Sequence, residues 1–482
     1  MTSLKISNKN FYNDIIWYLL GTIIPMGINV IKTPIFTRHY STEDYGYLGL
    51  VMTIFIYFST ASYSWIVSCI WRFFHQFKNE KKLNIFYSNI VFLFLLSTIL
   101  MLICSAFFIA FYHSPLLVLK LIILCFFHFT FKELLGLYFV ILRIKGEAKI
   151  SNLLLISQTI LSFITLIILA FNYNFDISSL ILSSIIIDFT FLIAIIIYNI
   201  KNLKIKQLDI SLINKNYLKL FFNFGRFVIF SNLFILLIVS SDRYILALYD
   251  TIENVGIYTK VYDIAQVTIT ALVFVFFSTI NPKMNNELAN NFEKSNTFLS
   301  KYIFSYIIII LPITFISSIF SKELSEFLLG RDFQKGHIIM PYVFFSAFIY
   351  GLITFNMNKL KFANQLKKII VILFICLAIN ILFNFIFIPY YGYIAAAFST
   401  LITYSAMLIL FFSVDSLSFF KEKKYIVSIS KQIIILTSFL IIDHYLKANI
   451  DYSIKTIIIE ITAFSIPFIY IFRKEYKILK DL

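Results

Sequence analysis

Charged residues are scarce in this chain. Only 14% of its 482 residues are Asp, Glu, Lys or Arg, whereas 60% are hydrophobic and the mean hydropathy is +0.86. A soluble chain of this size carries about 25% charged residues. Too little polar surface is therefore left for several water-soluble domains, and no long hydrophilic block offers room for a soluble catalytic domain.

Motifs for metal, nucleotide or hydrolytic chemistry are also missing. The four cysteines all lie inside apolar runs without the spacing of metal ligands, so we expect them to behave as small hydrophobic residues. The chain has no GxxxxGKS or GxxxxGKT loop for ATP, no HExxH and no GxSxG. We therefore expect no cofactor, no bound metal and no enzymatic activity.

Long apolar runs are abundant instead. They are about 20 residues long and follow one another closely, which is typical of a polytopic helical membrane protein. We expect an all-α fold with about fourteen transmembrane helices, the first of them a retained span because no clear cleavage site follows it. The expected spans are 13–35, 47–70, 85–111, 116–141, 152–171, 177–199, 219–241, 256–280, 300–320, 337–356, 367–388, 392–413, 425–446 and 454–472.

The net charge of +16 is concentrated in alternate loops. With fourteen spans, 28 Lys and Arg residues fall on the side that holds both termini, and 7 fall on the opposite side. Short loops rich in Lys and Arg stay in the cytoplasm. Both termini are therefore expected to be cytoplasmic, and the alternation argues against nucleic acid as the partner of the positive charge.

Two similar stretches lie almost half a chain apart. Glu43 to Gly46 aligns with Glu253 to Gly256 at a constant offset of 210 residues, which predicts a duplicated, transporter-like architecture. The offset sets the first span against the seventh. We expect an N-lobe at 1–200 with spans one to six, a cytoplasmic linker at 201–218, a C-lobe at 219–415 with spans seven to twelve, and spans thirteen and fourteen with a cytoplasmic tail at 416–482.

Polar side chains mark one face in each of two expected spans. Ionisable residues within a membrane are costly, and they usually face protein or a wet cavity. Lys260 and Asp263 share a helical face, which either turns inward or carries a neutralised pair near the outer interface. Asn29 and Lys32 share a face with Pro25, which either lines a cavity or lets the lysine snorkel outward.

Further ionisable residues lie deeper in the spans. Asp188 is near the middle of the sixth span, where it must be protonated, paired across helices, or a site for H⁺ or Na⁺. Arg226 lies seven residues into the seventh span and is able to snorkel back to the cytoplasm. His128, Lys132 and Glu133 form a polar island in the fourth span, for which we expect an internal pair between helices.

Three patches resemble one protein family. The stretches FTRHYSTEDYGYLGL at 36–50, SSDRYILALYDTIENVGIYTKVYDIA at 240–265 and PYYGYIAAA at 389–397 are similar to segments of bacterial polysaccharide repeat-unit flippases. These are the Wzx-type members of the MOP (multidrug/oligosaccharidyl-lipid/polysaccharide) exporter superfamily. The patches occur in the family's order and spread over most of the chain. One departure is Arg226, which stands where many relatives have Pro after Gly.

The resemblance implies a MATE-like pair of six-helix lobes around a central cavity in the bacterial cytoplasmic (inner) membrane. It implies that the protein flips undecaprenyl-diphosphate-linked oligosaccharide repeat units by alternating access, for biosynthesis of O-antigen or capsule. Lys and Arg in the cavity would offset the dehydration of the anionic diphosphate. A polysaccharide polymerase and chain-length proteins are candidate partners. The expected cargo-binding residues are Asn29, Lys32, Arg226, Lys260 and, at the outer mouth, Arg243, and the candidates for coupling to H⁺ or Na⁺ are Asp188 and Asp263.

Three alternatives remain open at this point. A cation-coupled multidrug exporter of the same superfamily would favour a cavity rich in carboxylates, whereas basic residues prevail within these spans. A flippase for a lipid-linked peptidoglycan precursor has the same span count, and the sequence separates it poorly. A membrane glycosyltransferase or polymerase would need a long outer loop with paired carboxylates, and the longest expected outer loop, 321–336, is too short.

Overall fold

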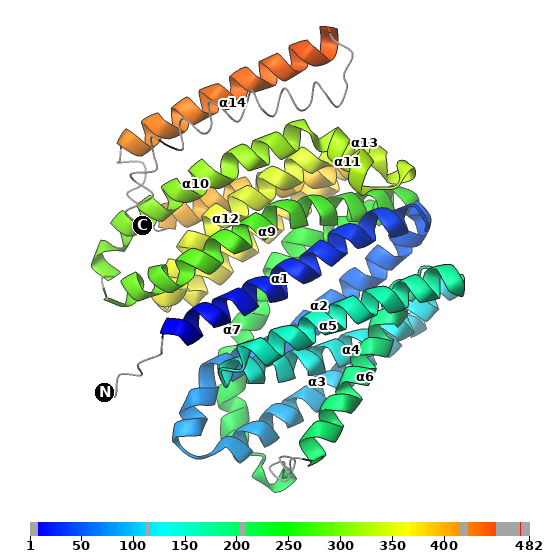
Figure 1. Ribbon diagram of the computed structural model, residues 1–482, viewed down its shortest axis with the longest axis vertical. Coiled ribbons are helices and arrows are strands. Elements are labelled where there is room, and N and C mark those ends of the chain that lie inside the picture. The colour runs from blue at the N-terminus through cyan, green and yellow to red at the C-terminus, as the bar shows by residue number, and fades with distance from the viewer. Residues whose placement is uncertain are drawn as a thin grey trace. The chain divides into compact units, whose positions relative to one another are not determined.

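Every regular element that the structure describes is a helix (Figure 1). The computed structural model describes residues 8–111, 115–201, 209–290, 292–414, 423–449 and 473. The all-α prediction is confirmed for these residues. Long apolar runs dictate this outcome, because a helix satisfies its backbone hydrogen bonds within one segment and so tolerates a hydrocarbon environment.

The described elements follow one another with short connections. The N-terminal part holds α1 (Asn8–Thr37), α2 (Thr42–Asn79), α3 (Leu83–Phe111), α4 (Leu116–Ile144), α5 (Ala148–Ile167), the π-helical turn η1 (Ile168–Asn172) and α6 (Ser179–Lys201). The remainder holds η3 (Ile210–Leu212), α7 (Lys215–Ser240), α8 (Asp242–Tyr249), α9 (Ile252–Asn290), η4 (Phe292–Lys294), α10 (Ser295–Ile319), α11 (Ser321–Leu328), η5 (Arg331–Ile339), α12 (Met340–Phe362), α13 (Leu366–Val414) and α14 (Lys423–Asn449).

The helices agree with the expected spans. Within the described residues, 11 helical segments are long and apolar enough to cross a membrane, and α4 coincides with the expected fourth span. One segment, α13, covers two expected spans, which meet at Gly392, where φ is 55° and the helix is broken. The chain is therefore a multi-pass membrane protein. The expected span 454–472 lies outside the described residues, as do residues 202–208 of the expected linker.

The chain divides into two compact units. The first contains Met1–Val261, Glu326–Gly336 and Leu373–Ala396, and the second contains Tyr262–Ser325, His337–Ile372 and Ala397–Leu482. Each unit is assembled from separate parts of the chain. The expected lobe boundaries at 201–218 and 415 stay a prediction.

In the first unit, α2 is the helix around which the others pack. It contacts α3, α4 and α7, while α1 lies along α5 and α6 lies along both α4 and α5. The rings of Phe77, Phe86 and Phe221 from α2, α3 and α7 meet with centroids 5.3 to 5.9 Å apart, and all three are fully buried. Aromatic rings at these distances supply large contact areas between the helices.

The second unit has an aromatic interior. The fully buried Tyr306 ring of α10 lies 5.2 Å from Phe276 and 5.4 Å from Phe348, between centroids, and its hydroxyl donates to the Phe348 carbonyl oxygen at 2.9 Å. The helix α14 docks on α10, where Gln432 Nε2 donates to the carbonyl oxygen of Ile308 at 3.0 Å. Both buried polar groups thus have backbone partners, as burial requires.

Candidate functional site

The two repeated stretches fold alike at the starts of α2 and α9. The Oγ of Ser41 accepts a hydrogen bond from the backbone N–H of Asp44 at 3.1 Å, which caps α2. At the offset of 210, the Oγ1 of Thr251 accepts from the N–H of Asn254 at 3.3 Å. The same cap is therefore built twice from equivalent residues. We call residues 41–49 and 251–259 together the repeat junction.

Two of the expected cargo-binding lysines belong to the first unit and interact electrostatically. Lys32 on α1 and Lys260 on α9 lie close enough for their ammonium groups to repel each other. The Nζ of Lys260 lies 5.4 Å from the centroid of the Tyr45 ring, which stabilises a cation. Asn29 is exposed one turn before Lys32 on α1. An anion placed between the two lysines would be attracted by both ammonium groups.

Arg243, which we expected at the outer mouth, is held by a hydrogen bond to α2. It is only 7% exposed, and its Nη1 donates to Thr53 Oγ1 on α2 at 3.1 Å. The neighbouring Asp242 is fully buried and accepts a hydrogen bond from the hydroxyl of Tyr258. Both residues begin the short helix α8, whose buried residues also include Ile245 and Leu246. A role of Arg243 in cargo binding stays a prediction.

Arg226 does not join the lysine pair. It is exposed on α7, and its guanidinium lies over the ring of the adjacent Phe227, 5.0 Å from the centroid. The end of α7 at Ser240 lies about 21 Å further along the helix, at 1.5 Å per residue. Arg243 follows that end, so it lies far from Arg226 along the axis of α7. Its predicted contribution to the cavity remains untested.

Asp188 is paired across helices, as one of the three expected alternatives required. The carboxylate on α6 is buried, and Gln158 Nε2 on α5 donates to its Oδ1 at 2.5 Å. On α4, His128 Nδ1 lies 3.7 Å from Asp188 Oδ2, and Lys132 lies near enough to attract the carboxylate. Lys32 is also near enough to act electrostatically on His128, so this network adjoins the lysine pair.

The other two residues of the polar island on α4, Lys132 and Glu133, have different surroundings. Glu133 accepts a hydrogen bond from the Ser59 hydroxyl on α2 at 2.7 Å, whereas Lys132 is exposed with its Nζ 5.4 Å from the Phe129 ring centroid. The expected internal pair therefore joins α4 to α2 through a serine. Asp263, the other ion-coupling candidate, is half-buried on α9 in the second unit, and its role stays a prediction.

Sequence reasoning missed the neutral partners of these charges. Gln158 holds Asp188, Ser59 holds Glu133 and Thr53 holds Arg243. Gln158 carried a usable signal, since a polar amide inside an expected span is nearly as conspicuous as a charge. Ser and Thr gave none, because they commonly bond to their own helix backbone.

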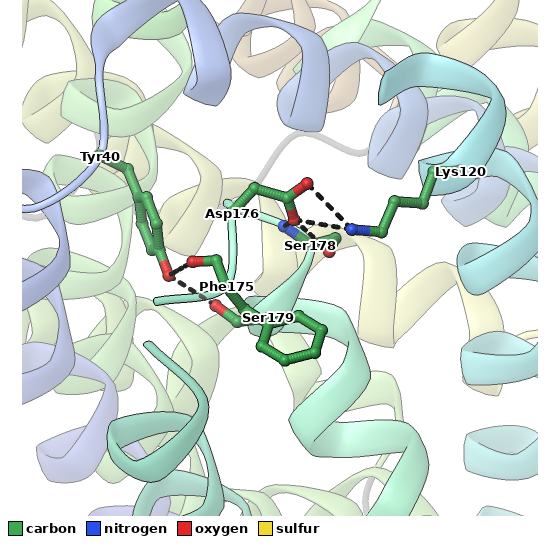
Figure 2. Close-up of polar contacts among 6 residues, drawn as sticks. All are labelled: Tyr40, Lys120, Phe175, Asp176, Ser178 and Ser179. Carbon is green, nitrogen blue, oxygen red and sulfur yellow. Dashed lines mark hydrogen bonds and ion pairs between the residues drawn. The ribbon is translucent and has the colours of Figure 1, made fainter. Parts of the chain in front are cut away.

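A second polar cluster braces the turn between α1 and α2 (Figure 2). The hydroxyl of Tyr40 donates to the Phe175 carbonyl oxygen at 3.0 Å and lies 2.7 Å from Ser179 Oγ. Asp176, beside it, accepts from the Ser178 hydroxyl and from Lys120 Nζ on α4, the latter at 2.9 Å. Partial burial acts to raise the pKa of Asp176, but the bonds from Ser178 and Lys120 outweigh it, so the pKa lies below its ordinary value.

Metal and thiol chemistry find no support in the described residues. Among them, no group of three or more His, Cys, Asp or Glu residues is arranged to hold a metal ion. The thiols of Cys69, Cys125 and Cys376 are buried, that of Cys104 is half-buried, and all four are free. The cysteines therefore pack as small hydrophobic residues, as their positions in apolar runs predict.

The family is decided by a match over more than half of the chain. The family model described as "Polysaccharide biosynthesis protein" matches residues 11–286 of the 482. The chain belongs to this family. The expectation drawn from the three sequence patches is thereby confirmed at the level of the family. Among curated proteins, no sequence matches the chain.

Solved membrane transporters share the fold. The lipid II flippase MurJ, in an inward closed conformation, is 18% identical with a TM-score of 0.73, over 96% of this chain and 99% of that chain. A point mutant of the Vibrio cholerae MATE transporter VcmN is 13% identical with a TM-score of 0.59, over 85% and 98%. An inward-facing multidrug resistance MATE transporter of the MOP superfamily is 13% identical with a TM-score of 0.60, over 87% and 96%. The chain therefore has the fold of these transporters.

Proposed function

We propose that this protein flips undecaprenyl-diphosphate-linked oligosaccharide repeat units across the cytoplasmic membrane for surface polysaccharide biosynthesis. The observation that carries the proposal is the pairing of Lys32 with Lys260 inside a flippase fold of the polysaccharide biosynthesis family. Two ammonium groups that lie close together create a local positive potential, which attracts an anion. A diphosphate is an anion of suitable charge for this pair.

The physical problem that such a protein solves is the passage of the head group. A diphosphate with its sugars cannot cross about 30 Å of hydrocarbon unaided. Charge-assisted hydrogen bonds from Lys32 and Lys260 would offset the dehydration of the phosphates, and the exposed amide of Asn29 would bond to sugar or phosphate oxygens. The polyprenyl tail needs no such help, because it can stay in the lipid.

An ion gradient is the proposed energy source, because the chain lacks a nucleotide-binding motif. Asp188 is the better supported of the two candidates. It is buried, and His128 and Gln158 adjoin it, so one carboxylate, one imidazole and one amide can redistribute a proton or bind a cation. H⁺ and Na⁺ both suit this set.

Two other cargoes have some support. The likeness to multidrug transporters, together with the buried Asp188, favours an organic cation, whereas the lysine pair disfavours it. A lipid-linked peptidoglycan precursor is the cargo named for MurJ, and it carries the same diphosphate chemistry. The lysine pair does not discriminate between these two lipid-linked cargoes. The surface polysaccharide is favoured by the family match.

The test is made in a strain that lacks the gene. Lipid-linked intermediates are extracted, identified by mass, and assigned to a leaflet by their accessibility to an added membrane-impermeant glycosidase or oxidant. We expect a complete repeat unit to accumulate on the cytoplasmic side while surface polysaccharide is lost. The wild-type gene should restore export, and a Lys32→Arg variant, which keeps the charge, should restore it in part.

The alternatives give distinct outcomes in the same strain. Normal surface polysaccharide together with raised sensitivity to cationic drugs would contradict the proposal and favour drug export. Accumulation of a peptidoglycan precursor with lysis would favour the other lipid-linked cargo.

A further inference from the structure

The repeat junction brings two backbones into direct contact. A Cβ atom on Gly256 would overlap the carbonyl oxygen of Thr42 and lie 2.7 Å from the amide nitrogen of Gly46. A Cβ atom on Gly46 would overlap the carbonyl oxygen of Ile252, which stands 210 positions after Thr42. Each glycine thus meets the equivalent residue of the other copy. This reciprocity is the signature of a local two-fold axis.

A third glycine lies at that axis. A Cβ atom on Gly49 would lie 2.9 Å from Cγ2 of Thr259, the residue at the offset of 210 from Gly49 itself. A residue meets its own equivalent only where the axis passes. The starts of α2 and α9 therefore cross at these glycines, and at Gly46 and Gly256 no side chain separates the two backbones. Only glycine permits so close an approach.

The segment Glu326–Gly336 packs against the same end of the first unit. The Phe333 ring meets the Tyr45 ring edge-on, with centroids 5.4 Å apart. The amide nitrogen of Gly330 donates to Thr37 Oγ1 at 2.9 Å, and a Cβ atom on Gly336 would press on Ile257. The backbone at Gly330 and Gly336 and the ring of Phe333 therefore pack tightly against this end of the first unit.

Tyr45 connects the closed end to the lysine pair. Tyr45 directly precedes Gly46 and is only 5% exposed. Its ring contacts both the ammonium group of Lys260 and the ring of Phe333. An anion beside Lys32 and Lys260 is a stronger partner for an ammonium group than an aromatic face. Binding of an anion therefore competes directly with the contact between Lys260 and Tyr45.

We propose that the repeat junction is the outer gate of the protein, held shut by its paired glycines, and that Tyr45 couples this gate to cargo through Lys260. The outer side is the one that holds 7 of the Lys and Arg residues in the connecting loops. Closure depends on Gly46, Gly49 and Gly256. The coupling through Tyr45 rests on the proposed function, whereas the gate itself does not.

The gate is tested by cysteine accessibility. A Leu50→Cys reporter lies one turn inward of Gly46 and half-buried, in a chain whose four native cysteines are replaced by alanine. A membrane-impermeant methanethiosulfonate is added to intact cells. We expect Gly256→Ala to raise the labelling rate roughly tenfold, because overpacking at the contact shifts the gate toward its open state. The matched controls are Gly27→Ala and Gly136→Ala, whose Cβ atoms would meet nothing within 4 Å.

A second variant keeps the gate testable if the first one misfolds. If Gly256→Ala does not reach the membrane, Gly49→Ala replaces it, since its Cβ atom presses only on the side chain of Thr259, and a smaller rise in labelling is expected. Labelling equal to that of Gly27→Ala in a folded junction variant would overturn the gate. A rise seen only when the reagent is added to the cytoplasmic face would overturn its assignment to the outer side.

The coupling is tested on purified protein in nanodiscs with undecaprenyl diphosphate as the probe. We expect the probe to raise labelling of the Leu50→Cys reporter severalfold, to do so equally in Tyr45→Phe, which keeps the ring, and to have no effect in Tyr45→Leu. Binding of the probe without any change in labelling would refute the coupling alone. Absence of probe binding would instead count against the proposed function and leave the glycine result standing.

Discussion

The two copies of the repeated stretch share a backbone and differ in chemistry. Both begin their helix with a hydroxyl cap and both place a glycine at the crossing, at 46 and 256. One turn later, the first copy has the apolar Leu50 where the second has Lys260. The two copies therefore meet at equivalent backbone positions. The second copy carries a charge on Lys260 that the first copy lacks at Leu50.

A similar asymmetry separates the interiors of the two units. The first unit buries Asp188 against His128 and Gln158. The second unit buries Asp443 and also Lys359, whose Nζ donates to Asn296 Oδ1 at 2.6 Å. Both units therefore bury ionisable groups, each of which costs stability in a membrane, and they satisfy these groups with different partners.

The largest effect is expected where the copies differ in charge. Lys260→Ala, which makes the second copy resemble the first, should lower export roughly ten- to a hundredfold, because a hydrogen bond to a charged group contributes about 1.5–3 kcal/mol. Lys32→Ala should act in the same way. Surface polysaccharide and the cytoplasmic pool of lipid-linked repeat unit provide the readout. Lys260→Arg is the matched control, and full export by both alanine variants at normal protein levels would remove the lysine pair from the mechanism.

The second prediction concerns Asp188, the buried carboxylate of the first unit. Asp188→Ala should lower the free energy of unfolding by about 1–3 kcal/mol, because it leaves the buried amide of Gln158 without its acceptor. Asp188→Asn retains an acceptor and should cost less stability while still impairing ion coupling. Thermal unfolding in detergent measures the first effect, and transport under an imposed ion gradient measures the second. Equal melting temperatures for Asp188→Ala and wild type would show that the pairing contributes nothing.

The third prediction compares the two helix caps. Ser41→Ala and Thr251→Ala should each destabilise by about 1 kcal/mol, as for other lost caps. The loss should be greater at Ser41, since Asp44 also accepts from the Ser41 backbone N–H and completes a capping box. Melting temperatures of the two variants, measured side by side, decide the order. The reverse order would mean that Asp250, which accepts from the Thr251 N–H at 2.7 Å, makes the second cap the stronger one.

The smallest effect is expected at the brace beside Tyr40. Because the pKa of Asp176 is lowered in the folded protein, its carboxylate stabilises the fold above the unfolded pKa of about 3.9, and this contribution is lost as pH falls through the lower folded value. The pair with Lys120 is nearly half exposed, so Lys120→Met should cost less than about 1 kcal/mol at pH 7. The difference in melting temperature between variant and wild type should shrink toward pH 3. A difference that grows with acidity would contradict the sign of the shift.

The sequence alone was sufficient for the all-α membrane fold and for the repeat. Long apolar runs predict membrane-spanning helices, because a backbone in lipid must satisfy its hydrogen bonds within the protein. The offset of 210 aligned Ser41 with Thr251 and Gly46 with Gly256, and the structure places these pairs at one junction.

The side-chain partners were less accessible to sequence reasoning. Arg243 was expected at the outer mouth, but nothing in the sequence indicated that its guanidinium would donate to Thr53 on α2. Asp188 was recognised as unusual, but its partners come from α4 and α5 at sequence separations of 60 and 30 residues. Periodicity along one helix carries no information about which other helix lies opposite, so such contacts require the tertiary structure.

The most direct measurement uses purified protein in proteoliposomes that contain an undecaprenyl-diphosphate-linked oligosaccharide. Loss of the sugar from the reach of an external glycosidase, or its appearance there, reports flipping in the absence of partner proteins. Vesicles with the wild-type protein are expected to flip the lipid. Vesicles with a protein that carries both Lys32→Ala and Lys260→Ala are expected to flip it no faster than vesicles without protein. Wild-type vesicles that leave this lipid in place, yet transport an organic cation down an ion gradient, would contradict the proposed function.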